Sequence, residues 1–216
     1  MGSGVLPYAL SPLVVSRDPA ASFSRLREKV PKAEEGAFAS TLHCRPPQPS
    51  RRNVPTSIPS HRPVRRAEAA DLDALVALEQ GVFDSDRLSR RQYRRHLASA
   101  SALVLVVDGS RPSLAGAAVV FFRKGSAVAR LYSLATAAEA RGKGVASALM
   151  AAVEAAARAR GCRVLRLEVR ADNLAAIHLY EHLGYRRIGH LAAYYDDGAD
   201  GWRYERSLTS AAAETA

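Results

Sequence analysis

Between an apolar strand pattern and an alanine-rich helical run stands the segment Arg141-Gly142-Lys143-Gly144-Val145-Ala146. The strand pattern covers residues 128–135, and the helical run covers residues 147–160. Glycines let the backbone turn tightly, and the free N–H groups of a helix's first turn, at the positive end of its dipole, face any anion placed there. The segment therefore predicts a phosphate cradle made of a strand, a loop and a helix.

The spacing within this segment excludes two common phosphate-binding motifs. The dinucleotide-binding fingerprint needs a third spaced glycine, and the nucleotide P-loop needs a lysine followed by Ser or Thr. Neither is present, because Gly142 and Gly144 are the two glycines of the segment and Lys143 is followed by Gly144. Arg141 and Lys143 add positive charge, so we expect the cradle to bind the phosphates of a different ligand.

A second block follows the cradle: Leu167-Glu168-Val169-Arg170, Asn173, Ala176, Leu179-Tyr180 and Leu183-Gly184-Tyr185. The spacing of Arg141, Gly144 and Ala146, together with this block, resembles the GCN5-related N-acetyltransferases, the acyl-CoA-dependent GNAT family. Residues 167–195 look most like the RimI-type enzymes of that family, which acetylate protein N-termini such as those of ribosomal proteins. The resemblance covers residues from about 64 to 208 and nothing before them.

Length and composition bound the class of protein. A chain of 216 residues is enough for one domain of about 150 residues and a tail. Its 48% hydrophobic and 24% charged residues are typical of a soluble globular protein, and no run approaches the ~18 apolar residues of a membrane span. The two cysteines, Cys44 and Cys162, lie on either side of the predicted domain boundary, so we expect no disulfide framework and a reducing, cytoplasmic location.

The net charge of +10 divides evenly along the chain. Residues 1–64 hold nine Lys and Arg against four Asp and Glu, and residues 65–216 hold 22 against 17. Specific nucleic-acid binding would need these charges on one face together with stacking aromatics, which are 6% of the chain. We therefore expect a solvated, arginine-rich surface and no specific nucleic acid, with some of the charge suited to CoA or to a ribosomal surface.

Residues 1–62 differ from the rest in showing no long helical or strand period and in their recurrent prolines. We expect a disordered basic tail there, a domain over residues 63–210, and a disordered C-terminus at 211–216. An organellar transit peptide and a later translation start are alternatives for the tail. Its glutamates Glu28, Glu34 and Glu35 are unlike a transit peptide.

The periodicity of the domain predicts an α/β fold. The elements expected in order are a strand at 64–67, helices at 72–83 and 90–98, strands at 102–107, 115–122 and 128–136, the helix after the cradle, a strand at 164–169, a helix at 173–183, and a hairpin of 185–188 with 202–208. A strand reached through a helix pairs in parallel, so the sheet is mainly antiparallel with one parallel pair. The resemblance implies the same GNAT acyl-CoA N-acyltransferase fold, with a V-shaped opening between the fourth and fifth strands for acetyl-CoA.

Two of the predicted elements carry charged or capping residues of interest. Asp71 is placed to cap the first helix, and Ser89 with Gln92 forms a capping box for the second. The second helix carries an exposed basic face, Arg90, Arg91, Arg94 and Arg95. This face is either simply solvated or a contact for an acidic substrate, because these helices border the acceptor site in the family.

Two residues are candidates for acid–base chemistry. Glu168 is a carboxylate in an otherwise apolar strand, which is unusual unless it is paired or catalytic. An ion pair with Arg166 or Arg170 is the alternative, whereas the resemblance implies a general base. Tyr180 carries a phenol that is neutral at pH 7 and able to protonate a thiolate. A buried core aromatic is the alternative, whereas the resemblance implies the general acid.

The resemblance also assigns ligand contacts. It places acetyl-CoA on the cradle residues Arg141 to Ala146, including Gly142, Lys143, Gly144 and Val145, on the backbone of Leu134 and Ala135, and on Asn173 and Tyr180. From the residues alone, Asn173 is a helix N-cap. Tyr194 and Tyr195 resemble paired tyrosines beside the acceptor peptide in RimI-type enzymes. Their alternative is an ordinary surface loop.

The leading hypothesis is an acetyl-CoA-dependent N-acetyltransferase, monomeric or weakly dimeric, that acts on a protein N-terminal amine. His178, His182 and His190 lack partners at ligand spacing, so we expect no metal. Direct transfer is favoured, because no nucleophilic triad is visible. A small-molecule acceptor (an amino acid, polyamine or aminoglycoside) is one alternative, since the region before Val128 matches only in broad pattern. A CoA-binding module without turnover is another.

Overall fold

The computed structural model describes residues 63–209, with gaps at 84–85 and 111. The predicted tails at 1–62 and 211–216, and Cys44 with them, lie outside the described residues. The elements in order are β1 (Val64–Arg66), a 3-10 turn (Ala69–Asp71), α2 (Leu72–Val82), α3 (Arg90–Ala98), β2 (Ala102–Asp108), β3 (Leu114–Phe122), β4 (Val128–Thr136), a 3-10 turn (Ala138–Ala140), α4 (Val145–Ala159), β5 (Val164–Arg170), α5 (Leu174–His182), β6 (Arg186–Leu191) and β7 (Gly201–Ser207).

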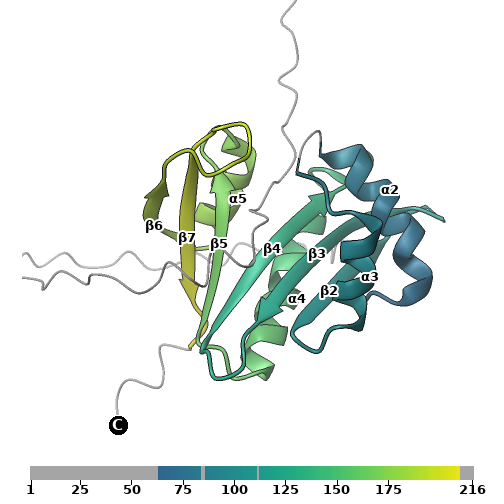
Figure 1. Cartoon of the computed structure of the whole chain (residues 1–216), viewed down its shortest axis with the longest axis horizontal. Helices are drawn as coiled ribbons and strands as arrows, with labels where there is room; N and C mark the ends of the chain where they lie inside the picture. The colour runs from purple at the N-terminus through teal and green to yellow at the C-terminus, as the bar shows by residue number, and fades with distance from the viewer. Residues whose placement is uncertain (1–62, 84–85, 111, 210–216) are drawn as a thin grey trace, which may run out of the picture. The chain divides into compact units, whose positions relative to one another are not determined.

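The described residues form a seven-stranded sheet in the order β1-β2-β3-β4-β5-β7-β6 (Figure 1). Every neighbouring pair is antiparallel except β4 and β5, which are parallel. This confirms the predicted α/β sheet with one parallel pair. The final hairpin is also confirmed, and its second strand, β7, lies between β5 and β6.

The parallel pair is short, and its end creates the opening in the sheet. Strands β4 and β5 pair from Val128 opposite Val164 to Arg130 opposite Arg166, although both strands continue well beyond these residues. The register between β3 and β4 also shifts there, leaving Tyr132 as an extra residue. The pairing of the two strands therefore ends after Arg130. Figure 1 shows β4 and β5 moving apart along their length. The second half of β4 then has backbone groups that do not pair with β5.

Helices cover both faces of the sheet, with α2 and α3 on one face and α4 on the other (Figure 1). Because successive residues of a strand point to opposite faces, β4 contributes to two separate cores. Leu131 and Leu134 pack with α4 and α5, whereas Tyr132 and Ala135 pack with α2 and α3. Within the described residues, the core on the α2 and α3 face contains no residue of β5, β6 or β7.

Helix starts follow the predicted capping chemistry, with one correction. In the capping box of α3, Ser89 N donates to Gln92 Oε1 at 2.8 Å and Gln92 N donates to Ser89 Oγ at 3.3 Å. Asp71 does precede α2, but its carboxylate accepts from Glu68 N and from Arg65 rather than capping that helix. The nearby arginine attracts the carboxylate more strongly than a neutral helix end does.

The helix after the cradle begins at Val145, two residues earlier than expected. Gly144 has a left-handed φ of 76°, so the chain turns directly into the helix after it. Helix α5 begins after Asn173, as predicted, and Gly184 ends this region with a φ of 81°. Cys162 is a free, buried thiol whose pKa is raised by burial.

Candidate active site

Five of the six residues of the predicted cradle, all except Lys143, line a cavity with a volume of about 340 Å³. The cavity lies between the start of α4 and helix α5. Its lining residues are Thr136, Ala140, Arg141, Gly142, Gly144, Val145, Ala146, Ser147, Ala175 and Leu179. Gly142 and Gly144 both have left-handed φ angles, of 72° and 76°. A side chain at either position would be strained, which explains the two glycines.

The electrostatics of this cavity suit a pyrophosphate. The first helical hydrogen bond of α4 runs from Ala148 N to Gly144 O, so the N–H groups of the preceding helical residues have no partner within the helix. Those residues line the cavity, and no acidic side chain does. The Thr136 hydroxyl also lines it and is buried with no hydrogen-bond partner among the described residues. The residues present therefore fit the diphosphate of a CoA molecule.

Glu168 is fully buried and is held by two arginines that the sequence interpretation did not name. Its Oε2 accepts from Arg130, at 3.0 Å from Nε and 2.9 Å from Nη2. Its Oε1 accepts from Arg203 Nε at 2.9 Å. Arg166 and Arg170, the partners considered from sequence, pair with other carboxylates instead. The sequence therefore correctly indicated an ion pair for Glu168, but Arg166 and Arg170 are not its partners.

The topology of the sheet explains these partners. Leu167 and Val169 point into the core beneath α4 and α5, so Glu168 points to the opposite face. Arg203 is the cross-strand neighbour of Glu168 on β7. Arg130 reaches it from β4, where pairing with β5 ends. Glu168 therefore lies at the point where the sheet opens.

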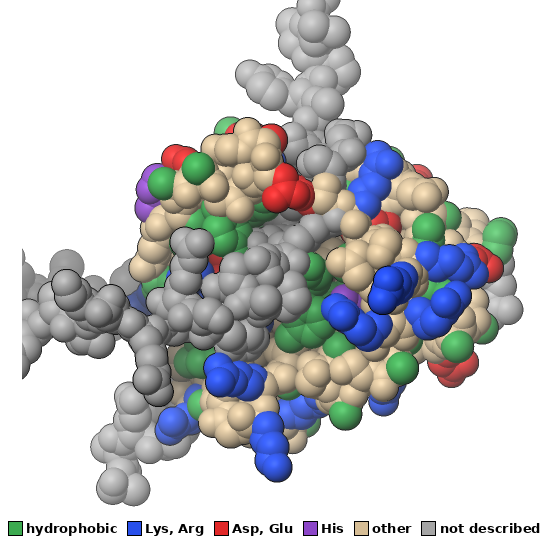
Figure 2. Space-filling model, viewed as in Figure 1, with side chains coloured by type: hydrophobic (Ala, Val, Ile, Leu, Met, Phe, Trp, Pro, Cys, Tyr) green, Lys and Arg blue, Asp and Glu red, His purple; other side chains and the backbone are tan. Residues whose placement is uncertain are grey.

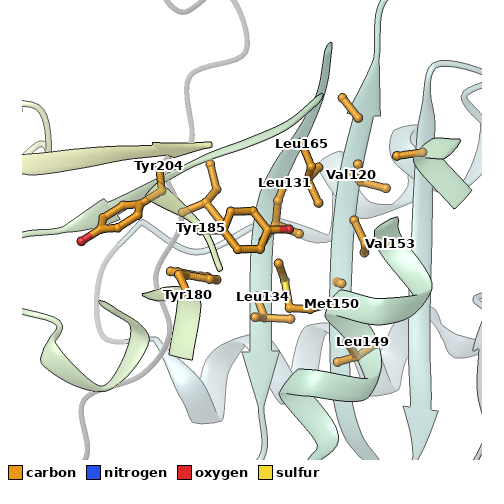
Figure 3. Packing of buried hydrophobic residues seen from close by; sticks show 14 of the residues in the cluster. Val120, Leu131, Leu134, Leu149, Met150, Val153, Leu165, Tyr180, Tyr185 and Tyr204 are labelled. Atoms are coloured by element: carbon orange, nitrogen blue, oxygen red, sulfur yellow. The ribbon is translucent and has the colours of Figure 1, made fainter. Parts of the chain in front are cut away.

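Tyr180 is fully buried on α5, among the residues drawn in Figure 3. Its ring centre lies 5.9 Å from that of Tyr185 and 6.5 Å from that of Tyr204. Its hydroxyl has no hydrogen-bond partner within the described ranges, and burial raises the pKa of the phenol. Tyr180 is thus a core aromatic, as the alternative expected, but one with an unsatisfied hydroxyl that costs roughly 1–3 kcal/mol. Such a group is suited to a ligand.

Tyr194 and Tyr195 lie in the loop between β6 and β7, and both backbone N–H groups donate to Ala199 O. Tyr195 is buried, so the surface-loop interpretation is wrong for this residue. Burial, then the neighbouring Tyr194, Glu168 and Tyr180, raise the pKa of Tyr195. Arg130 donates both to Glu168 and to the Tyr194 hydroxyl, and the ring centres of Tyr194 and Tyr195 lie 5.5 Å apart, so the structure brings Glu168 and the two tyrosines into one neighbourhood.

The remaining predicted contacts lie between the cradle and this neighbourhood. Leu134 and Ala135 occupy the diverging half of β4, directly before Thr136 of the cradle. Asn173 is buried, and its Oδ1 accepts from Ala176 N at 3.1 Å, which confirms the N-cap. Tyr180 directly follows Leu179, another residue of the cradle wall. Two elements therefore lead away from the cradle: β4, through Leu134 and Ala135, and α5, through Leu179 and Tyr180.

Sequence reasoning missed Arg130, Arg203 and Thr136. A signal for Arg130 was present, because it is a charged residue inside the apolar strand pattern of residues 128–135, as Glu168 is in its own strand. Opposite charges in two adjacent buried strands indicate a pair. The Thr136 hydroxyl gives no such signal, because threonine is common in strands.

Other predicted features lie away from this site. The four arginines of the basic face are exposed on α3, and Figure 2 shows Lys and Arg side chains gathered over this helix. Arg90 is paired with Asp73. His190 Nε2 lies 2.8 Å from Asp200 Oδ2. Residues 63–209, outside their gaps, contain no group of three or more His, Cys, Asp or Glu able to hold a metal ion. No helix described in this range is long and apolar enough to cross a membrane.

Comparison with known proteins identifies the family. The model of the acetyltransferase (GNAT) family matches residues 70–185, more than half of the chain. The chain therefore belongs to the GNAT family, which confirms the resemblance and the fold that it implies. The cradle, the diverging strands β4 and β5, and the buried tyrosine of α5 all lie within or at the edge of this matched range.

Individual relatives are similar over shorter stretches. N-alpha-acetyltransferase 30 of Schizosaccharomyces pombe is 41% identical over 71 residues, which are 33% of this chain and 47% of the relative. An N-alpha-acetyltransferase of Saccharolobus solfataricus is 37% identical over 87 residues, 40% of this chain and 50% of the relative. The chain thus spans about half the length of the curated relatives it matches.

A solved structure is similar over a longer range. The ribosomal-protein-S18-alanine N-acetyltransferase of Escherichia coli superposes with a TM-score of 0.61 and 25% sequence identity. The match covers 71% of this chain and 97% of that enzyme. This likeness extends over nearly the whole bacterial enzyme.

Proposed function

We propose that this chain transfers an acetyl group from acetyl-CoA directly to a primary amine, and that the acceptor is the α-amine of a protein N-terminus. The observation that carries the proposal is a cradle suited to an anion at the end of the diverging strand β4, together with a buried carboxylate on β5 and a buried phenol on α5 that has no partner in the described part of the chain. Family membership supports the reaction type. The names of the two curated relatives support the N-terminal acceptor.

The cradle residues would hold the cofactor. The α4 N-terminus and the side chains of Arg141 and Lys143 supply the positive field for a diphosphate. Acetyl-CoA supplies the activated thioester when bound. In the second half of β4, alternate backbone N–H groups point away from β3, and β5 does not pair with them there. Such a group at Leu134 or Ala135 would donate to the pantetheine arm.

The two candidate acid–base groups would move the protons. Glu168 accepts the proton that the attacking amine loses as the N–C bond forms. Tyr180 donates a proton to the sulfur as the C–S bond breaks, and solvent restores the proton to the phenol. The raised pKa of Tyr180 keeps the phenol protonated at neutral pH. Tyr194 and Tyr195 would border the amine's approach.

The acceptor is tested by measuring thiol release from acetyl-CoA with a panel of amines. The panel contains short peptides that differ at their first two residues, the same peptides with a blocked N-terminus and an internal lysine, free amino acids, a polyamine and an aminoglycoside. We expect turnover with free peptide N-termini only. Turnover confined to small amines would instead support the small-molecule alternative, and no turnover with acetyl-CoA bound would support a binding module.

The variant Gly144→Asp separates the cofactor from the acceptor in this test. It places a side chain at a left-handed φ and a negative charge at the cradle, so acetyl-CoA should bind at least about 100-fold more weakly. Calorimetric titration measures the affinity, and a thermal melt checks that the domain remains folded. Unchanged affinity would remove the cradle from the proposed site.

A further inference from the structure

The buried arginine on β4 is not accounted for by the roles assigned so far. Arg130 is only 4% exposed, although arginine is seldom buried. Its guanidinium grips one oxygen of Glu168 with two nitrogens, and one of these nitrogens, Nη2, also donates to the Tyr194 hydroxyl at 3.1 Å. One side chain therefore contacts the candidate base and a candidate acceptor-binding residue at the same time.

The position of Arg130 in the sheet makes this contact specific. It is the last β4 residue paired with β5, and its partner across the strands is Arg166. Glu168 lies two residues further along β5, where its backbone pairing with β4 has ended. The ion pair thus bridges the two strands where backbone hydrogen bonds no longer do.

Stability alone does not explain such a pair. Removing two charges from water costs about as much as their attraction returns, and apolar replacements of buried pairs are often neutral. The adjacent strand pair, β5 and β7, contains an ion pair with less of this cost: Arg166 pairs with Glu205, and both side chains are partly exposed. The buried pair at Glu168 therefore has a role that the exposed pair lacks.

We propose that Arg130 is a positioning residue, which holds the Glu168 carboxylate and the Tyr194 hydroxyl in one fixed arrangement around the acceptor amine. The assignment rests on the proposed function. A carboxylate has about four lone-pair sites. The two arginines occupy some of them, and the rest remain available to accept a hydrogen bond from the amine. Arg130 thereby determines which direction of approach reaches the base. The Tyr194 hydroxyl accepts from the same guanidinium, so a movement of the guanidinium also displaces Tyr194.

The two contacts require a side chain at position 130 that can donate to Glu168 and to Tyr194 at the same time. A guanidinium is a planar fork with several donors, whereas the lysine ammonium is a compact point charge on a flexible stem. Lysine at position 130 would keep the charge beside Glu168 but would not hold Glu168 and Tyr194 together. Gln at this position would remove both the charge and the fork.

The test compares Arg130→Gln and Arg130→Lys with the matched control Arg166→Gln. With the best amine from the acceptor panel, Arg130→Gln should lower kcat/KM by about 100-fold, the size of effect that a misplacement of about 1 Å produces. Arg130→Lys should recover part of the loss, and Arg166→Gln should stay within about 3-fold of wild type. Calorimetric affinity for acetyl-CoA should be the same in all four proteins. Equal kcat/KM in Arg130→Gln and wild type would overturn the proposal.

Coupling to Tyr194 is the sharper readout. Tyr194→Phe removes one hydroxyl and leaves the buried ion pair intact, so it remains informative if Arg130→Gln fails to fold. Tyr194→Phe should lower kcat/KM by several-fold in the wild-type background and have little further effect in Arg130→Lys. If the fold-losses of Tyr194→Phe and Arg130→Lys multiply in the double variant, the two residues act independently, and the proposal is rejected.

A structural readout separates this proposal from the proposed function. Amide hydrogen exchange of the loop at 193–199 should accelerate in Arg130→Gln and Arg130→Lys but not in Arg166→Gln. This measurement needs no substrate. Faster exchange, together with no acetylation of any amine, would support the positioning contact and reject the proposed enzymatic function. Unchanged exchange in an active enzyme would reject the positioning contact and leave the enzymatic function supported.

Discussion

Two buried glutamates of this domain are each held by two arginines, yet their surroundings differ. Glu154 on α4 accepts from Arg206 at 2.7 Å and Arg158 at 3.3 Å, and also from the Tyr185 hydroxyl at 3.0 Å. The second, Glu168, has its own two arginines but lies near tyrosines whose hydroxyls have no partner within the described residues. A network in which each group is satisfied serves structure, whereas an incompletely satisfied network leaves capacity for a substrate.

The same contrast separates two neighbouring tyrosines in one core. The rings of Tyr180 and Tyr185 lie 5.9 Å apart and are both buried. Tyr185 donates to Glu154, whereas the Tyr180 hydroxyl donates to no described residue. Their ring packing is therefore similar, and the difference between them lies in a single hydroxyl group. This makes them matched positions for substitution.

The largest expected effect comes from removing each of these hydroxyls. Tyr180→Phe should lower kcat by about 10²–10⁴-fold, the usual effect of a lost general acid, with unchanged acetyl-CoA affinity and a melting temperature no lower than that of wild type, because a buried hydroxyl without a described partner is removed. Tyr185→Phe should do the opposite: it should reduce the free energy of unfolding by about 1–3 kcal/mol, because a hydrogen bond to a charged carboxylate is lost, and leave kcat within about 3-fold. Steady-state kinetics and urea denaturation on both variants measure the two effects. A kcat loss of similar size in both would show that the hydroxyls do not differ in role.

The two glutamates offer a second pair of substitutions, with a smaller expected effect on rate. Glu168→Gln should lower kcat/KM by about 100-fold or more at neutral pH. Its residual activity should recover as pH rises, because the acceptor amine then loses its proton without help. Glu154→Gln should keep the wild-type pH–rate profile and lose about 1–3 kcal/mol of stability, since the hydrogen bonds to an ionised acceptor weaken. A Glu168→Gln profile parallel to that of wild type at all pH values would assign the base to another group.

Local chemistry could be predicted from the sequence of this chain, and long-range pairing could not. The cradle depends on neighbours in sequence: two glycines, two cations and a helix that starts beside them. The capping of α3 by Ser89 and of α5 by Asn173 is local for the same reason. Each of these predictions follows from backbone geometry within a few residues.

The partners of Glu168 are 38 and 35 residues away, so their identity depends on the register of three strands. That register follows from the bulge at Tyr132 and from the insertion of β7 beside β5, neither of which has a signal within a single strand. The nearest arginines in sequence, Arg166 and Arg170, were therefore considered first. The burial of Tyr195 was missed for the same reason, because a loop between distant strands is placed by the sheet.

The smallest expected effect concerns a buried group that lacks a partner but lies outside the site. His96 of α3 packs against Phe121 and Tyr132, with ring centres at 5.0 and 6.1 Å, and its Nε2 has no hydrogen-bond partner in the described part of the chain. Burial, and then the charge of Arg95, lower the pKa of His96 from 6.5 to about 4. An unsatisfied atom in the α2 and α3 core should therefore affect stability and not catalysis.

The sign of this effect follows from proton binding. Between pH 6.5 and about 4 the unfolded chain takes up a proton at His96 that the folded chain does not, so the free energy of unfolding falls as pH decreases through that window. Above this window His96 is neutral in both states and contributes no pH dependence. The loss is at most about 1.4 kcal/mol per pH unit. His96→Leu removes the titration, so the stability of wild type relative to this variant should decline by about 1–2 kcal/mol from pH 7 to 5. Urea denaturation at several pH values measures the difference, with Tyr180→Phe as the control that keeps the wild-type slope. Parallel curves for wild type and His96→Leu would show that this histidine takes up its proton equally in both states, and that a missing partner in this core has no measurable cost.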